Sequence, residues 1–136
     1  KAKYVFMGEK DFQQLYLIKK YLSKKYKVKI INCKTIRDKN YIALSTRNKL
    51  LSSKSYFETI KIVKELKNLK KKLSLKRYFS KINLVQKTSE LENLYKIHID
   101  YLEARNKKNL KVSKSNKEMR LFVAFWINNV RLIDNY

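Results

Sequence analysis

The first third of the chain alternates between short apolar runs and a helical pattern. Tyr4 to Met7 form an uninterrupted apolar run, which is typical of a strand covered on both faces. After Gly8 the apolar positions recur at helical spacing, which predicts a helix from Asp11 to about Lys24. Val28 to Cys33 is a second β-like run, so the segment predicts a βαβ unit with parallel strands. Two strands do not make a buried sheet, and the rest of it is expected to lie outside this sequence.

Helical patterns dominate the middle of the chain. Residues 34–55 carry no sustained periodicity and predict loops and turns, with helix near Asn48 to Leu51. From Tyr56 onward apolar residues recur every three positions with lysines between them, which predicts a long amphipathic helix with a solvated basic face. Its apolar positions are Phe57, Ile60, Val63, Leu66, Leu69 and Leu73. A second helix is predicted from Thr88 to Tyr95.

The last forty residues predict strands. Apolar residues alternate over 97–101, and 119–127 and 130–134 supply two further strands. Asn128–Asn129 between them indicates a tight hairpin, because Asn tolerates positive φ. The fold class predicted is therefore α/β: a βαβ unit in residues 1–52, followed by a small α+β C-terminal domain with an antiparallel sheet in residues 53–136.

The charge of the chain has two interpretations. Thirty-four Lys and Arg against 11 Asp and Glu leave a formal net charge of +23, which favours a nucleic-acid or anionic-membrane partner. A biased composition also produces this charge, because Lys, Asn, Ile and Tyr are plentiful while Gly, Pro and Ala are scarce. The lysines are spread along the chain with one dense cluster at Lys67 to Lys76, which favours composition over a phosphate-tracking groove.

Cysteine and histidine are too few for a metal cluster or an internal disulfide. Cys33 and His98 are single occurrences, and this usage suits a reducing, cytoplasmic environment. The longest apolar run, Leu121 to Ile127, is too short to span a bilayer, so no membrane partner is expected. The sequence begins without Met directly before a strand-like segment, and we expect it to be a piece of a longer protein.

The only glycine of the chain lies between the first strand and the first helix. At that position Gly8 lets backbone approach a ligand closely, and the helix that follows offers N–H groups to anions. Lys10 lies in the first turn, where a cation opposes the helix dipole, so its presence suggests an anionic ligand. A tight strand-to-helix turn with an ordinary surface lysine explains the same residues.

Two polar patterns have both a structural and a functional interpretation. Asp11 and Gln14 have the spacing of a capping box, or they contact a ribose hydroxyl and a polar substrate group. Ala43 to Asn48 (ALSTRN) places two hydroxyls beside an arginine, which suits a phosphate chain. The same residues also make a good helix cap.

In order along the chain, these segments resemble the C-terminal half of the pantothenate synthetase (pantoate–β-alanine ligase) family. The residues that carry the resemblance are FMGEKDFQQL, KTIRDKNYIALSTRNKLLS, IDYLEAR and LFVAFWINNVRLIDN. The resemblance implies a Rossmann-like fold of the nucleotidyltransferase superfamily and an ATP-dependent ligase. Such an enzyme activates pantoate as pantoyl adenylate with release of pyrophosphate, and β-alanine then attacks to give pantothenate and AMP.

The resemblance also implies residue roles. Gly8 and Asp11 match positions that hold the ATP ribose, Lys10 matches a lysine on the phosphates, and Gln14 matches a glutamine that binds pantoate. The catalytic electrostatic residues are then Lys10 and Arg47, with ATP and Mg²⁺ as cofactors and no protein metal ligand. Further ATP contacts fall at the adenine-facing backbone and the loop over the triphosphate: Thr35, Ile36, Leu44, Ser45, Thr46 and Arg47.

The chain departs from the family pattern in several places. Asn40–Tyr41 replace a usual Asp-Gly, Lys34 replaces a common Pro, and Thr46 replaces a serine. Losing the glycine could stiffen loop closure, which Asn40 partly offsets because it tolerates unusual φ. The histidine-containing signature and most of the pantoate pocket belong to an N-terminal half that this sequence does not contain. We therefore expect the chain alone to be inactive and, from the resemblance, the parent enzyme to be a homodimer.

His98 and the segment Lys111 to Ser115 are the remaining features of the sequence that could carry chemistry. His98 lies in a predicted strand and is expected to be a surface or strand histidine. Lys111 to Ser115 (KVSKS) looks like the signature loop of class I aminoacyl-tRNA synthetases, but it is expected in a connection between strands. The alternative functions are a basic nucleic-acid-binding module and a fragment retained for folding or dimerisation.

Overall fold

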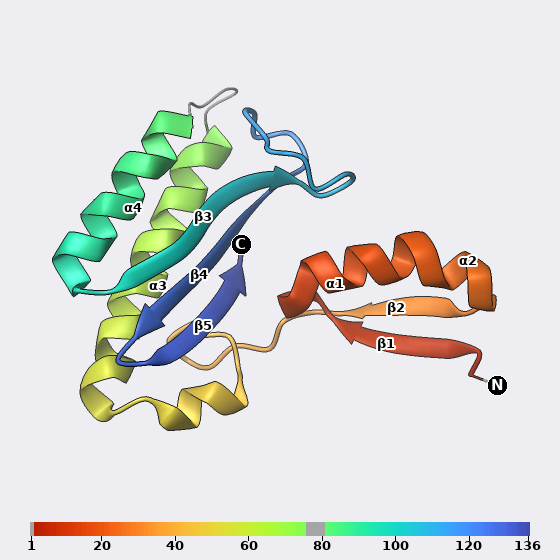
Figure 1. The fold of residues 1–136 in the computed structure, drawn as a ribbon, viewed down its shortest axis with the longest axis horizontal. Coiled ribbons are helices and arrows are strands. Elements are labelled where there is room, and N and C mark those ends of the chain that lie inside the picture. Colours follow the sequence, from red (N-terminus) through yellow and green to blue (C-terminus); the bar gives the residue numbers. More distant parts are fainter. Residues whose placement is uncertain (1, 76–80) are drawn as a thin grey trace. The chain divides into compact units, whose positions relative to one another are not determined.

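The computed structural model describes residues 2–75 and 81–136. The chain divides into two compact units, Lys1–Ile36 and Arg37–Tyr136, and Figure 1 shows the elements of each. Lys76, the end of the lysine cluster noted in the sequence, lies outside the described residues. The predicted domain boundary at 52/53 stays a prediction, and the compact second unit begins at Arg37.

The first unit contains the predicted βαβ arrangement. Strands β1 (Tyr4–Gly8) and β2 (Lys29–Cys33) pair in parallel. Between them runs a helical segment made of a 3-10 turn, two α-helical stretches and a π-helical stretch (Figure 1). These are η1 (Glu9–Asp11), α1 (Phe12–Leu17), η2 (Ile18–Leu22) and α2 (Ser23–Tyr26).

The side chains of β1 are more exposed than the sequence suggested. The apolar run predicted a strand covered on both faces, yet Tyr4 and Phe6 are 55% and 70% exposed. Within this chain a two-stranded sheet with one helical segment offers too little surface to cover both faces, and a strand covered on both faces stays a prediction for the longer protein. Leu15, on α1, is buried.

The second unit is a three-stranded antiparallel sheet with helices on one face (Figure 1). The central strand is β4 (Met119–Ile127), flanked by β3 (His98–Asn106) and β5 (Val130–Asn135). The helical elements are η3 (Thr46–Leu50), α3 (Ser53–Leu75) and α4 (Lys81–Tyr95). The predicted fold class, a parallel βαβ unit followed by an antiparallel α+β unit, is confirmed.

One apolar core joins α3 and α4 to the sheet. Leu66 from α3, Leu91 from α4 and Val123 from β4 are fully buried within it. The long helix buries a slightly different face from the predicted one, because Phe57 is 60% exposed while Thr59 and Ile62 are buried. A spacing of three residues drifts around a helix of 3.6 residues per turn, so it cannot follow one face for long.

Local signals at the ends of elements act as expected. The Ser52 hydroxyl accepts the Ser55 backbone N–H at 3.1 Å and caps α3. Asn128 and Asn129 have φ values of 43° and 63° and join β4 to β5, which confirms the predicted hairpin. No helix in the described parts of the chain combines the length and apolar character that crossing a membrane requires.

Candidate functional site

The first unit gathers its candidate residues at one edge of its sheet. Gly8 pairs with Cys33 at the carboxyl ends of the two parallel strands. Lys10 and Asp11 follow the end of β1, and Thr35 and Ile36 follow the end of β2. Ligands of open α/β sheets bind at such edges. The residues brought to this edge are Gly8, Lys10, Asp11, Thr35 and Ile36.

Neither the turn nor the packing of the described residues requires glycine at position 8. Gly8 has φ −70° and ψ 135°, an ordinary extended conformation. A Cβ built there would meet nothing within 4 Å. The strand does turn directly into η1, but this turn does not need glycine, and the open space at the strand end suits close approach by a ligand.

The first helical turn leaves the capping box unformed. Asp11 precedes α1, but no side-chain hydrogen bond caps the helix there. Gln14 is exposed, and Lys10 is half-buried in η1. The Asn32 amide donates to the Glu9 carboxylate at 3.2 Å and ties this turn to β2. No local pattern signals that contact, because the partners lie 23 residues apart.

The Leu44–Arg47 motif lies in the second unit. The Ser45 hydroxyl accepts the Arg47 backbone N–H at 3.3 Å, so the interpretation as a helix cap is confirmed. The Asn48 amide donates to the Ala43 carbonyl at 3.1 Å and closes the segment on itself. Capping uses the Ser45 oxygen as an acceptor, which leaves its O–H proton available to donate to a ligand.

An open hollow of about 580 Å³ lies in front of this motif. Leu44, Ser45 and Thr46 line it, whereas Arg47 is exposed and is not among its lining residues. Asn48, the last residue of the ALSTRN motif, lines it as well, whereas Asp38, Lys49 and Tyr56 were missed by the sequence analysis. Lys49 comes directly after the motif, and a positive charge so close to Ser45 and Thr46 was the signal that could have identified it.

The Asp38 carboxylate, which accepts three hydrogen bonds, fixes one wall of the hollow. Asp38 accepts the backbone N–H groups of Asn40 and Ile42 at 2.8 and 3.0 Å, and it also accepts the hydroxyl of Tyr56. Burial raises the pKa of Asp38, but these hydrogen bonds outweigh burial and hold the pKa below its ordinary value. The bond to Asp38 in turn raises the pKa of Tyr56.

An arginine anchors the start of the same segment to β5. The Arg37 guanidinium binds both carboxylate oxygens of Asp134, at 2.6 and 2.9 Å, and donates to the Asn135 carbonyl at 3.1 Å. It also donates to the Tyr41 carbonyl at 3.0 Å. The segment that carries the motif is therefore held at its base by a bidentate ion pair.

Tyr41, not Asn40, takes the unusual backbone conformation. Tyr41 has φ 66°, in the left-handed region, while Asn40 does not have positive φ. The expectation that Asn40 would absorb the unusual φ is therefore wrong. A bulky residue occupies the position at which glycine is least strained.

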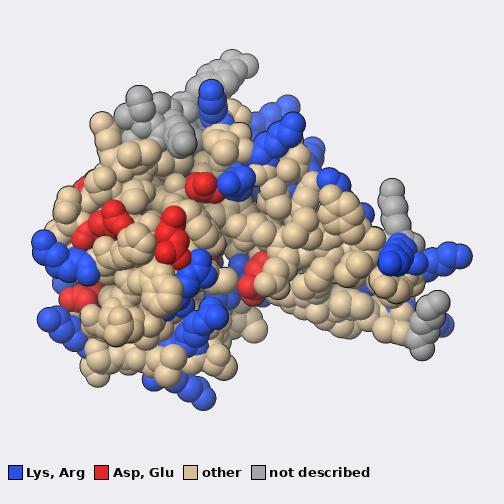
Figure 2. Space-filling model, viewed as in Figure 1, with Lys and Arg blue, Asp and Glu red and all other residues tan. Residues whose placement is uncertain are grey.

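The other features noted in the sequence belong to the second unit. His98 is 70% exposed at the start of β3, near Glu92 and Asp100, as expected of a strand histidine. Lys111 to Ser115 fall in the connection between β3 and β4, also as expected. On the face drawn in Figure 2, Lys and Arg are scattered and interspersed with acidic groups. Among residues 2–75 and 81–136, no three His, Cys, Asp or Glu side chains gather as a metal site.

The candidate residues thus fall into two sets, one in each unit. Gly8, Lys10 and Asp11 belong to Lys1–Ile36, and the motif with Arg47 belongs to Arg37–Tyr136. That Lys10 and Arg47 serve one triphosphate stays a prediction.

Comparison with known proteins gives one consistent family. The sequence model of pantoate-beta-alanine ligase matches residues 1–136. The pantothenate synthetase of Flavobacterium psychrophilum is 34% identical over 136 residues, which are 97% of this chain and 48% of that protein. Its counterpart in Buchnera aphidicola is 38% identical over 134 residues, which are 97% of this chain and 47% of that protein. The chain therefore spans about half the length of these relatives.

Solved structures agree with the sequence comparison. The pantoate-beta-alanine ligase of Francisella tularensis, complexed with beta-gamma ATP and beta-alanine, has a TM-score of 0.71 and 34% identity. The match covers 98% of this chain and 43% of that one. The pantothenate synthetase of Thermus thermophilus, at 21% identity and a TM-score of 0.74, shows the shared fold.

Proposed function

The chain belongs to the pantoate-beta-alanine ligase family, and from this premise we propose that the protein containing it condenses pantoate with β-alanine at the expense of ATP. The family match over residues 1–136 is the observation that carries the proposal. The gathering of candidate residues at the carboxyl edge of β1 and β2 supports it.

The proposed reaction has two steps. A carboxylate oxygen of pantoate attacks the α-phosphorus of ATP, and the bond to pyrophosphate breaks, which gives pantoyl adenylate. The β-alanine amine then attacks the acyl carbon, loses a proton, and AMP leaves. Charge builds on the phosphates in the first step, so the protein needs placed cations and N–H donors rather than a nucleophile. We assign these electrostatic roles to Lys10 and Arg47.

Binding roles follow the positions of the remaining candidates. Gly8 gives the ribose room at the strand end, because a Cβ there would meet none of the described residues within 4 Å. Asp11 accepts from a ribose hydroxyl, and the exposed Gln14 binds pantoate. The backbone of Thr35 and Ile36, directly after β2, lies against adenine.

The hollow in front of Leu44–Thr46 suits phosphate groups. Ser45 and Thr46 supply hydroxyl donors there, and Lys49 supplies a cation. The Asp38 carboxylate accepts three hydrogen bonds and so holds the wall of the hollow. The donor set fits ATP with Mg²⁺ held by phosphate oxygens and water. The metal, when bound, neutralises phosphate charge.

The isolated chain is proposed to be inactive. It spans about half the length of its relatives, so pantoate binding depends on residues outside it. We further propose that the complete enzyme is a cytoplasmic homodimer without a specific nucleic-acid partner.

The test is pantoate-dependent ATP–pyrophosphate exchange by the full-length protein. Lys10→Ala and Arg47→Ala are each expected to lower exchange by about 100-fold or more, because each removes a charge that acts in the transition state. Lys19→Ala and Lys61→Ala remove exposed lysines outside both candidate sets and serve as charge-matched controls. A wild-type protein without exchange, or variants as active as the controls, would contradict the proposal.

A further inference from the structure

Tyr41 holds a backbone conformation that a bulky residue rarely adopts. Its φ of 66° lies in the left-handed region, which is unfavourable for any residue with a Cβ. The conformation is held from both sides: the Tyr41 N–H donates to the Asp38 carbonyl and its carbonyl accepts from Arg37, both at 3.0 Å. The result is a ring that stands 56% exposed beside α3.

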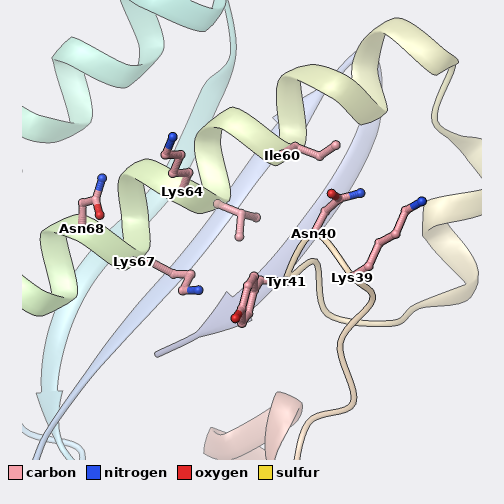
Figure 3. A pocket seen from close by; sticks show the side chains of 8 residues that line it. Lys39, Asn40, Tyr41, Ile60, Lys64, Lys67 and Asn68 are labelled. Carbon is pink, nitrogen blue, oxygen red and sulfur yellow. The ribbon is translucent and has the colours of Figure 1, made fainter.

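This ring forms one wall of a pocket of about 420 Å³ (Figure 3). The pocket lies between the turn 39–41 and one side of α3, which contributes Ile60, Val63, Lys64, Lys67 and Asn68. Ile60, Val63 and the Tyr41 ring give it an apolar surface. Its volume is in the range of sites that hold small organic ligands.

The charged groups of the pocket are all positive. Lys39, Lys64 and Lys67 line it, and no carboxylate is among its described lining residues. The Lys67 ammonium lies 3.0 Å from the centroid of the Tyr41 ring, and Figure 3 shows the two side chains facing each other. The aromatic face stabilises this ammonium without cancelling its charge, so the pocket keeps an unbalanced positive potential.

A second lysine pocket in the same unit provides the contrast. It has a volume of about 360 Å³ and contains Lys54, Lys61 and Lys96, but Glu58 lies among them. Its charges are therefore partly balanced within the protein. The pocket between the turn 39–41 and α3 has three lysines and no carboxylate among its described lining residues, so its charge suits an anion.

We propose that the pocket between the turn 39–41 and α3 binds a small molecule that carries an apolar ring and a phosphate group. The ring packs against Ile60, Val63 and Tyr41, and the lysines that line the pocket donate hydrogen bonds to the phosphate. This site shares no lining residue with the neighbouring hollow in front of Leu44–Thr46, and it does not depend on ligase chemistry.

Methyl-resolved NMR of the full-length protein, titrated with phenyl phosphate, tests the site directly. The methyl signals of Ile60 and Val63 are expected to shift in a saturable manner. Inorganic phosphate, which lacks the ring, and phenol, which lacks the charge, are each expected to bind at least tenfold more weakly. Binding of all three with equal affinity would overturn the proposal, and so would unchanged signals for Ile60 and Val63.

Variants separate the site from the general charge of the protein. Lys64→Gln with Lys67→Gln is expected to weaken phenyl phosphate binding at least tenfold. Lys54→Gln with Lys61→Gln removes the same charge from the same helix and is expected to change binding less than twofold. Tyr41→Gly removes the ring, and glycine adopts the positive φ of this position without strain. This variant is expected to weaken phenyl phosphate binding as much as Lys64→Gln with Lys67→Gln. Equal losses in both lysine pairs would show general electrostatics instead of a site.

Discussion

The two units of the chain differ most in what they bury. Among the described residues of Lys1–Ile36, Leu15 is the one buried side chain. In Arg37–Tyr136, α3, α4 and the sheet share one continuous apolar core. Apolar residues of the first unit remain at its surface instead, among them Tyr4, Phe6, Leu17, Tyr21 and Tyr26.

The two units share the predicted ATP residues but not the core. Gly8, Lys10, Asp11, Thr35 and Ile36 lie in the first unit, on a two-stranded sheet that has little core of its own, and such small sheets are marginal in water. The second unit holds the core that makes a fold stable. We infer that the second unit supplies the folding stability of this chain.

Removing the first unit tests this inference with the largest expected effect. A chain of residues 37–136 is expected to unfold cooperatively in urea at the midpoint of the 136-residue chain, because its core is complete. A peptide of residues 1–36 is expected to show no cooperative transition. Circular dichroism during urea titration measures both. Loss of the transition in 37–136 would mean that the first unit is part of the folding core.

Matched core truncations sharpen the comparison. Leu66→Ala is expected to lower the free energy of unfolding by about 2–5 kcal/mol, because Leu66 is fully buried in the shared core. Leu15→Ala, the same chemical change in the first unit, is expected to leave the main transition unchanged. The exposed Phe57→Ala is the control on α3. Equal losses of unfolding free energy for Leu15→Ala and Leu66→Ala would contradict the inference that the second unit supplies the folding stability.

The Arg37–Asp134 ion pair anchors the segment that carries the Leu44–Arg47 motif to β5, and its removal tests how much this anchor stabilises the fold. Arg37→Met leaves Asp134, which is 8% exposed, without its bidentate partner. We expect a loss of about 1–3 kcal/mol, less than for a fully buried pair because Arg37 is partly exposed. Arg131→Met removes the ion-pair partner of Asp100. Arg131 is more exposed than Arg37, so we expect the free energy of unfolding to fall by only about 0–1 kcal/mol. Equal losses of unfolding free energy for Arg37→Met and Arg131→Met, measured by urea titration, would show that the Arg37–Asp134 pair contributes no more than a surface ion pair.

The smallest effect is a pH dependence at Asp38. Its pKa is lowered in the folded protein, so its ionised form adds stability above the ordinary pKa of 3.8. That contribution is lost as the pH falls through the folded-state pKa. The difference in unfolding free energy between wild type and Asp38→Asn is therefore expected to shrink from pH 6 towards pH 3. A difference that does not change over this range would contradict the assigned hydrogen bonds.

Patterns that are local in sequence predicted much of the fold. The strands of the second unit and the Asn128–Asn129 hairpin were predicted because alternation and positive φ are properties of adjacent residues. The start of α4 was not, because Thr88 resembled a helix start. Its hydroxyl instead donates to the Leu84 carbonyl inside the helix, at 2.9 Å.

The roles of the candidate site residues stay predictions. The groups around Gly8 and Ser45 could be proposed from the sequence because their members are close together in it. Arg37 and Asp134 lie 97 residues apart, so only folding brings them together. The conformation of Tyr41 is held by Asp38 and Arg37, three and four residues earlier in the chain, and the sequence marked this place only through the lost Asp-Gly, without showing which residue takes the positive φ.

The most direct test of the account is a crystal structure of the full-length protein with a non-hydrolysable ATP analogue. The account predicts that the Lys10 ammonium and the Arg47 guanidinium both lie within hydrogen-bond distance, about 2.7–3.2 Å, of phosphate oxygens of the same nucleotide. A bound nucleotide that is contacted by neither residue, or by residues of one unit alone, would contradict it.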